Sequence, residues 1–97
     1  MKFYFVYILK CADGTYYTGF TSDLHIRFEE HQKGTFKNSY TYSRRPVSLV
    51  FFEKFTNPNL VIATEKQLKK WSKAKKEALI SKAYHKLPDL AKKKTFN

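Results

Sequence analysis

The sequence predicts a small α/β domain of the α+β type, in which a three-stranded, mainly antiparallel sheet is flanked by helices in the order ββαβαα. Three observations predict this class. Residues 3–9 are apolar on both alternating faces, as expected for a strand covered on both sides. Asp13-Gly14 then marks a hairpin turn. Asn57-Pro58 opens a lysine-rich C-terminal third that is typical of helices.

Turn and cap residues define the remaining elements. A second strand over residues 15–20 should pair antiparallel with the first. Thr21-Ser22-Asp23 offers N-caps for a helix over 24–33, which Gly34 ends. Residues 35–46 predict a loop, 47–55 a third strand, 57–71 a helix and 74–86 a further helix. We therefore expect one domain over residues 1–86 and a basic tail over 87–97.

Composition limits the classes of function. Ninety-seven residues suffice for one domain, and 42% hydrophobic residues can build a core, which excludes a disordered chain. The single cysteine, Cys11, excludes an intramolecular disulfide and most cysteine-based metal sites, and a cytoplasmic setting is expected. The apolar N-terminal run is too short to span a bilayer, so we expect no membrane association. A small monomer is the default expectation.

Positive charge is concentrated at the back of the chain. The net charge is +11, and residues 66–97 carry eleven lysines against two acids. Such a surface attracts polyanions, chiefly nucleic acid, although lysine is also simply a good helix former. The basic residues that we expect to contact nucleic acid are Arg44, Arg45, Lys66, Lys69, Lys70 and Lys73.

Two charged residues lie where apolar ones are expected. In the first helix Leu24, Phe28 and His31 share one face, and Arg27 is four residues before His31. Arg27 could simply extend its stem over the apolar surface.

Glu65 is the second such residue, since its helical neighbours Val61 and Leu68 are apolar. A carboxylate on the core side needs a partner. Arg27, a metal ion or both would serve, and a purely structural Arg27–Glu65 ion pair is the alternative. The chain is also rich in tyrosine, with Tyr4, Tyr7, Tyr16, Tyr17, Tyr40 and Tyr42 within 39 residues.

Together these residues resemble the GIY-YIG nuclease superfamily. Residues 5–7 (Phe-Val-Tyr) and 17–19 (Tyr-Thr-Gly) resemble the two halves of its motif, separated by a hairpin turn. Residues 23–31, with Arg27 and His31, are similar to the helix that carries the family's essential arginine. Residues 44–47 and 65–71 resemble the small single-domain bacterial members, which are similar to the N-terminal domain of an excision-repair nuclease. The resemblance covers roughly residues 3–83.

The resemblance implies an endonuclease that hydrolyses phosphodiester bonds in DNA, whether branched, damaged or single-stranded. It implies one divalent metal ion, Mg²⁺ or Mn²⁺, held by Glu65. Arg27 would stabilise the transition state, Tyr17 would activate water, and Tyr7 would be its partner. Because a free tyrosine has a pKa of about 10, the base role requires the metal and Arg27 close by. The implied supporting residues are His31, Tyr40 and Gly19.

The hairpin supplies a geometric test of a shared tyrosine site. A two-residue Asp13-Gly14 loop would pair Ala12 with Thr15 and put Tyr7 and Tyr17 on opposite faces. A three-residue loop with Gly14 in the left-handed region would pair Cys11 with Thr15 and put both tyrosines on one face. The nuclease hypothesis therefore predicts the three-residue loop.

Some positions depart from the family pattern. Phe5, Val6 and Thr18 replace the family's Gly and Ile residues at packing positions, and Tyr42 stands where close relatives show a basic residue. No equivalent of the family's late Asn is found. One alternative is a nucleic-acid-binding module that does not cut, although binding alone does not need Glu65. Another is a structural component of a ribonucleoprotein.

Overall fold

A computed structural model describes residues 2–82 and confirms the predicted order of elements. The elements are β1 (Tyr4–Lys10), β2 (Tyr16–Thr21), α1 (Leu24–Lys33), the short 3-10 helix η1 (Tyr42–Arg44), β3 (Ser48–Phe55), α2 (Pro58–Lys69) and α3 (Lys73–Lys82). The strands differ from the predicted bounds by one residue. The predicted loop contains η1, and the helix that we predicted to reach residue 71 ends at Lys69. The predicted helix end at residue 86 and the tail over 87–97 lie outside the described residues.

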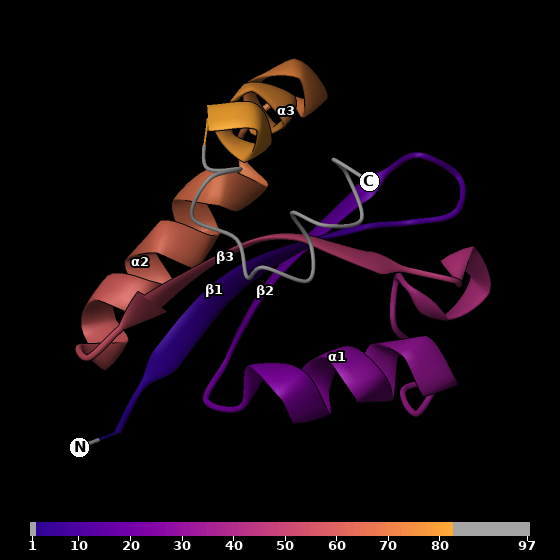
Figure 1. Ribbon diagram of the computed structural model, residues 1–97, viewed down its shortest axis with the longest axis horizontal. Coiled ribbons are helices and arrows are strands. Elements are labelled where there is room, and N and C mark those ends of the chain that lie inside the picture. Colours follow the sequence, from indigo (N-terminus) through magenta and orange to yellow (C-terminus); the bar gives the residue numbers. More distant parts are fainter. Residues whose placement is uncertain (1, 83–97) are drawn as a thin grey trace, which may run out of the picture.

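The sheet is antiparallel with the strand order β2-β1-β3, so that β1 is central. Helix α1 covers one face and α2 covers the other, with α3 beyond the end of α2 (Figure 1). Four consecutive residues of β1, from Val6 to Leu9, are buried. The apolar character of both faces of this strand follows from its place between two helical layers.

Each face of the sheet has its own core. Val6 and Ile8 of β1 pack with Val61 and Leu68 of α2. On the other face Tyr7, Leu9 and Cys11 form a second buried cluster with Val47, against which Leu24 and Phe28 of α1 pack. Alternate residues of β1 thus point to opposite helices. Because Tyr7 points toward the α1 layer, one of the predicted site residues is also a core residue.

The turn between β1 and β2 has the three-residue form that the nuclease hypothesis predicts. The Cys11 amide donates to the Thr15 carbonyl over 2.8 Å, and Gly14 has a φ of 86°. In the resulting register Leu9 pairs with Tyr17. The side chains of Tyr7 and Tyr17 therefore lie on one face of the sheet, as predicted.

The three predicted capping residues, Asp23, Gly34 and Asn57, are confirmed. Asp23 accepts a hydrogen bond from the Ile26 amide at the start of α1, and Gly34 ends that helix with a φ of 75°. Asn57 accepts from the Asn59 amide at the start of α2. Within residues 2–82, none of the helices has the length and apolar character needed to cross a membrane.

The loop after α1 is held at both of its ends. The amide group of Gln32 bonds to both the N–H and the carbonyl of Val47, each over 2.8 Å. Three residues before Val47, the Arg44 guanidinium donates to the Asp13 carboxylate over 3.0 Å. These bonds fix the loop over the α1 side of the sheet, where it overhangs the tyrosine pair.

Candidate active site

Three rings from three elements meet on the α1 side of the sheet. The Tyr7 hydroxyl and Nε2 of His31 are hydrogen-bonded at 2.9 Å. The ring centroids of Tyr17 and His31 are 5.1 Å apart, and those of Tyr7 and Tyr17 are 6.3 Å apart. None of these three pairs is local in sequence, so the register of the hairpin and the position of His31 on α1 bring the rings together.

His31 is held at both ring nitrogens. Its Nδ1 is 2.8 Å from the Thr41 hydroxyl, opposite the bond to Tyr7. Burial and the positive charge of Arg27 lower the pKa of His31, so the imidazole is neutral near pH 7. A neutral imidazole donates from one nitrogen and accepts at the other, and each nitrogen here has a hydroxyl partner. His31 is therefore a fixed bridge between β1 and the loop.

Burial has the opposite effect on the tyrosine of β1. Desolvation, followed by the proximity of Tyr17, raises the pKa of Tyr7 well above its usual value, although neighbouring Arg27 opposes the rise. Tyr7 thus keeps its phenolic proton at neutral pH. It is suited to orient a ligand or a water molecule rather than to accept a proton.

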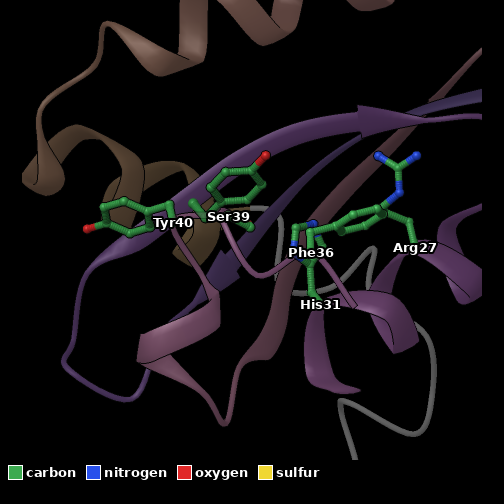
Figure 2. A pocket seen from close by; sticks show the side chains of 6 residues that line it. Arg27, His31, Phe36, Ser39 and Tyr40 are labelled. Atoms are coloured by element: carbon green, nitrogen blue, oxygen red, sulfur yellow. The ribbon is translucent and has the colours of Figure 1, made fainter. Parts of the chain in front are cut away.

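Two cavities open around these rings. The first has a volume of about 350 Å³ and is lined by Tyr17, Arg27, His31, Phe36, Ser39 and Tyr40. Figure 2 shows Tyr40 at one end of this cavity and Arg27 at the other, with Phe36 and His31 between them. The second, of about 450 Å³, is lined in part by Tyr7, Tyr17, Gly19, Arg27 and Glu65. Tyr17 and Arg27 line both cavities, so the two form adjoining parts of one region.

Gly19 permits the close approach of the two tyrosines. A Cβ atom at this position would lie 2.5 Å from the Tyr7 hydroxyl oxygen and 3.1 Å from the Tyr17 ring. Such contacts are too short for any side chain to be accepted without displacement of the rings. The glycine of the second half-motif is therefore required by space.

The two charged residues do not form the ion pair that we considered for Arg27 and Glu65. Arg27 instead pairs with Glu30 of its own helix, with 3.0 Å between Nε and Oε1. Glu65 pairs with Lys69, whose Nζ lies 2.6 Å from Oε2. Each partner is three or four residues further along the same helix, where side chains meet without long-range constraint.

The carboxylate of Glu65 fits a hard divalent cation. The residue is only 7% exposed, yet it lines the larger cavity beside two tyrosines. Within residues 2–82 no group of three or more His, Cys, Asp or Glu side chains gathers to hold a metal ion. One carboxylate, completed by water and phosphate oxygens, suits Mg²⁺ or Mn²⁺ better than a metal that needs nitrogen or sulfur ligands.

The basic residues expected to contact nucleic acid differ in whether other residues of the protein already bind their charged groups. Arg44 bonds to Asp13, and its guanidinium lies 3.8 Å from the centre of the Tyr40 ring. Arg45 donates to the Tyr42 carbonyl over 2.8 Å. Both arginines thus hold the loop together. Lys66, Lys70 and Lys73 are exposed, so their charges are available to a ligand.

The structure adds residues that the sequence did not single out. Phe36 and Ser39 line the smaller cavity, and Thr41 binds His31. Ten residues separate Thr41 from His31, and nothing local in the sequence marks that contact. Lys69 is different, since its position four residues after Glu65 is a recognisable helical pairing signal.

Comparisons with known proteins identify relatives of this chain. A family described as "GIY-YIG catalytic domain" matches residues 3–78. A UPF0213 protein of Syntrophus aciditrophicus is 46% identical over 76 residues, covering 78% of this chain and 87% of the relative. One of Halobacterium salinarum is 43% identical over 74 residues, covering 76% and 95%.

Solved structures show the same likeness. The solution structure of a UPF0213 protein from Bacillus halodurans is 38% identical, covers 81% of this chain and 83% of that chain, and gives a TM-score of 0.54. That of a protein from E. faecalis is 33% identical, covers 91% and 92%, and gives 0.58. GIY-YIG domains form a nuclease superfamily whose members bind nucleic acid and generally use a divalent metal. The chain belongs to the GIY-YIG domain family, among small single-domain proteins of the UPF0213 group.

Proposed function

We propose that this protein is a monomeric, metal-dependent endonuclease that hydrolyses phosphodiester bonds in DNA. One observation carries the proposal. Tyr7, Tyr17, Arg27 and Glu65 come from β1, β2, α1 and α2, and all four line the same cavity. A packing role for each residue separately does not require that convergence, whereas phosphodiester hydrolysis requires these types of group around one phosphate.

The charges divide the reaction between two residues. Glu65 would hold the cation, which when bound supplies positive charge to the phosphate and to the leaving oxygen. Arg27 would stabilise the negative charge that grows on the phosphate as the water–phosphorus bond forms and the bond to the leaving oxygen breaks. Arg27 lines both cavities, so a phosphate at their junction can reach its guanidinium.

The tyrosines take unequal roles. Tyr17 would accept the proton of the attacking water, a role that requires positive charge nearby to favour its phenolate. Tyr7 keeps its proton and would orient the water or the phosphate. His31 fixes the Tyr7 hydroxyl and acts as a positioning residue. Gly19 provides the space in which the two rings meet, and Tyr40 closes the far end of the smaller cavity.

Binding would use the lysine-rich helices. Lys66, Lys70 and Lys73 are exposed on α2, just after its end and at the start of α3, and can contact the sugar–phosphate backbone without reading bases. DNA is the substrate that we propose.

A non-cutting binding module is the second candidate. It is favoured by the ion pairs of Arg27 with Glu30 and of Glu65 with Lys69, which occupy both charged groups.

Cleavage assays separate the two candidates. Wild type, Glu65→Gln and Glu53→Gln would be incubated with labelled single-stranded, duplex, flap and branched DNAs and matching RNAs, in Mg²⁺, Mn²⁺ or EDTA. Glu53 is an exposed carboxylate of β3 and serves as the matched control. We expect cleavage of DNA by wild type and Glu53→Gln, none in EDTA, and a loss of at least about 100-fold in Glu65→Gln. Salt-sensitive binding without cleavage in every metal would contradict the proposal and support the binding module.

A further inference from the structure

Lys69 occupies the carboxylate to which the proposed function assigns the metal. Its Nζ lies 2.6 Å from Oε2 of Glu65, and this contact raises the pKa of Lys69. The Glu65 carboxylate is buried, whereas the Lys69 side chain is 53% exposed. The carboxylate is therefore fixed, and the lysine can swing into solvent on its flexible stem at little cost.

A second lysine increases the positive charge near Lys69. Lys76 of α3 is 9% exposed, and no carboxylate of residues 2–82 forms an ion pair with it. Burial and the charge of Lys69 together lower the pKa of Lys76. The ammonium groups of Lys69 and Lys76 thus lie near each other, and a ligand with negative charge would relieve their repulsion. A phosphate of the nucleic-acid backbone has the required charge and oxygen acceptors.

We propose that Lys69 couples metal binding to nucleic-acid binding: it holds Glu65 in the free protein and moves to a backbone phosphate when nucleic acid binds, freeing the carboxylate for the cation. This inference rests on the proposed metal role of Glu65.

The physical basis is competition at one carboxylate. An ammonium group bonded to Glu65 repels a divalent cation that approaches the same oxygens. A phosphate that draws Lys69 away removes this repulsion and also offers oxygens to the cation. Metal and nucleic acid then strengthen each other's binding by the same factor, because coupling between two ligands is reciprocal. The free protein would accordingly hold little metal.

Mn²⁺ binding to the free protein tests the first half of the proposal. Electron paramagnetic resonance titrations would compare wild type, Lys69→Gln, Lys66→Gln and Glu65→Gln. Lys66 is exposed and adjacent to Glu65, and its substitution removes the same charge without breaking the ion pair. We expect Lys69→Gln to bind Mn²⁺ about tenfold more tightly than wild type, within the ordinary range of coupling between sites. Lys66→Gln should change the affinity much less.

Oligonucleotide binding tests the second half. Anisotropy titrations would use a labelled, hydrolysis-resistant phosphorothioate oligonucleotide with and without Mn²⁺. Mn²⁺ should tighten binding about tenfold in wild type and in Lys66→Gln, and clearly less in Lys69→Gln. Glu65→Gln reports any effect of Mn²⁺ on the oligonucleotide itself.

The outcomes separate this inference from the proposed function. Equal Mn²⁺ affinities in Lys69→Gln and Lys66→Gln would overturn the coupling role, since only bulk charge would then matter. An equal effect of Mn²⁺ on oligonucleotide binding in wild type and Lys69→Gln would overturn it as well. If Mn²⁺ tightens oligonucleotide binding in Glu65→Gln as much as in wild type, the metal role of Glu65 fails, and the proposed function fails with it.

Discussion

The hydroxyl of Tyr7 and Nε2 of His31 are joined by a buried hydrogen bond of 2.9 Å, which links the central strand to α1. Because burial lowers the pKa of His31, the folded protein takes up the imidazole proton at a lower pH than the unfolded chain. Protonation would leave the ring with a donor at both nitrogens and an uncompensated charge in the core. The burial of this imidazole thus makes stability depend on pH.

We expect the free energy of unfolding to fall as pH decreases below about 6.5. Above this value both states hold a neutral imidazole, and below it the unfolded chain gains a proton that the folded chain resists. Urea unfolding between pH 5 and 7 would measure the decline. His31→Gln should flatten it, whereas His25→Gln, at an exposed position on the same helix, should not. A decline of unchanged slope in His31→Gln would rule out His31 as its origin.

Tyr7→Phe and Tyr17→Phe should separate stability from activity. Loss of the Tyr7 hydroxyl leaves Nε2 of buried His31 without its partner, which costs about 1–3 kcal/mol. No hydrogen bond to the Tyr17 hydroxyl is present within residues 2–82, so Tyr17→Phe should change stability by less than about 0.5 kcal/mol. Urea unfolding and cleavage assays would be run on the same preparations. Full activity in folded Tyr17→Phe would exclude the role that we propose for that residue.

Gly19→Ala should disturb the site more than Gly14→Ala does. The added methyl group at Gly19 meets the Tyr7 hydroxyl and ring. We expect the free energy of unfolding to fall by about 2 kcal/mol and the cleavage activity to be lost. At Gly14 an added Cβ would lie 3.9 Å from Nζ of Lys73, an ordinary contact, so the cost of about 1 kcal/mol comes from the left-handed backbone. Thermal unfolding and near-ultraviolet circular dichroism of the tyrosines would distinguish the two variants. An unperturbed tyrosine spectrum in Gly19→Ala would show that the rings accommodate the methyl group.

Thr18→Val is expected to stabilise the protein. Among residues 2–82, only the Thr18 hydroxyl is buried without a hydrogen-bond partner, on the face of the sheet that packs against α2. Replacing it with a methyl group should add about 1 kcal/mol to the free energy of unfolding. Thr41→Val makes the same chemical change at a hydroxyl that binds His31, and it should destabilise by a similar amount. Urea unfolding of both would show opposite signs, and a loss of stability in both would refute the assignment of Thr18.

The salt dependence of nucleic-acid binding should identify the surface that contacts phosphates. Lys66→Gln should lower the slope of the logarithm of affinity against the logarithm of salt concentration by about 1. Lys33→Gln removes an exposed charge from α1, on the other side of the sheet, and should leave the slope unchanged. Anisotropy titrations from low to moderate salt would measure both. Equal changes in the two variants would mean that net charge, rather than the α2 surface, determines the slope.

Local signals in the sequence were sufficient to predict the fold. The helix starts at Asp23 and Asn57 depend on side chain–backbone contacts within a few residues, and the helix end at Gly34 depends on its own left-handed backbone, so the local sequence reveals all three. The central position of β1 followed from apolar residues on both of its faces. The extra residue in β3, where Leu9 pairs with Leu49 and Ile8 with Phe51, had no such signal, because it depends on how the two strands meet.

The site was predictable in its members and less so in its contacts. The family resemblance singled out Tyr7, Tyr17, Arg27 and Glu65, which line one cavity. The ion partners were not predicted, because Arg27 and Glu65 each pair with a neighbour on the same helix rather than with each other. The bond between Thr41 and His31 depends on a loop conformation that no local pattern specifies.

The pairing of Cys11 with Thr15 across the turn over residues 12–14 matters more than the letters of the turn itself. Loss of one codon that leaves a two-residue turn keeps this pair, and both tyrosines then stay on one face. A shift of the pairing by one residue inverts the pleat of β2 and carries the Tyr17 ring to the α2 side, even though every site residue is still encoded. Gene variants with every motif letter intact can therefore still lack the site.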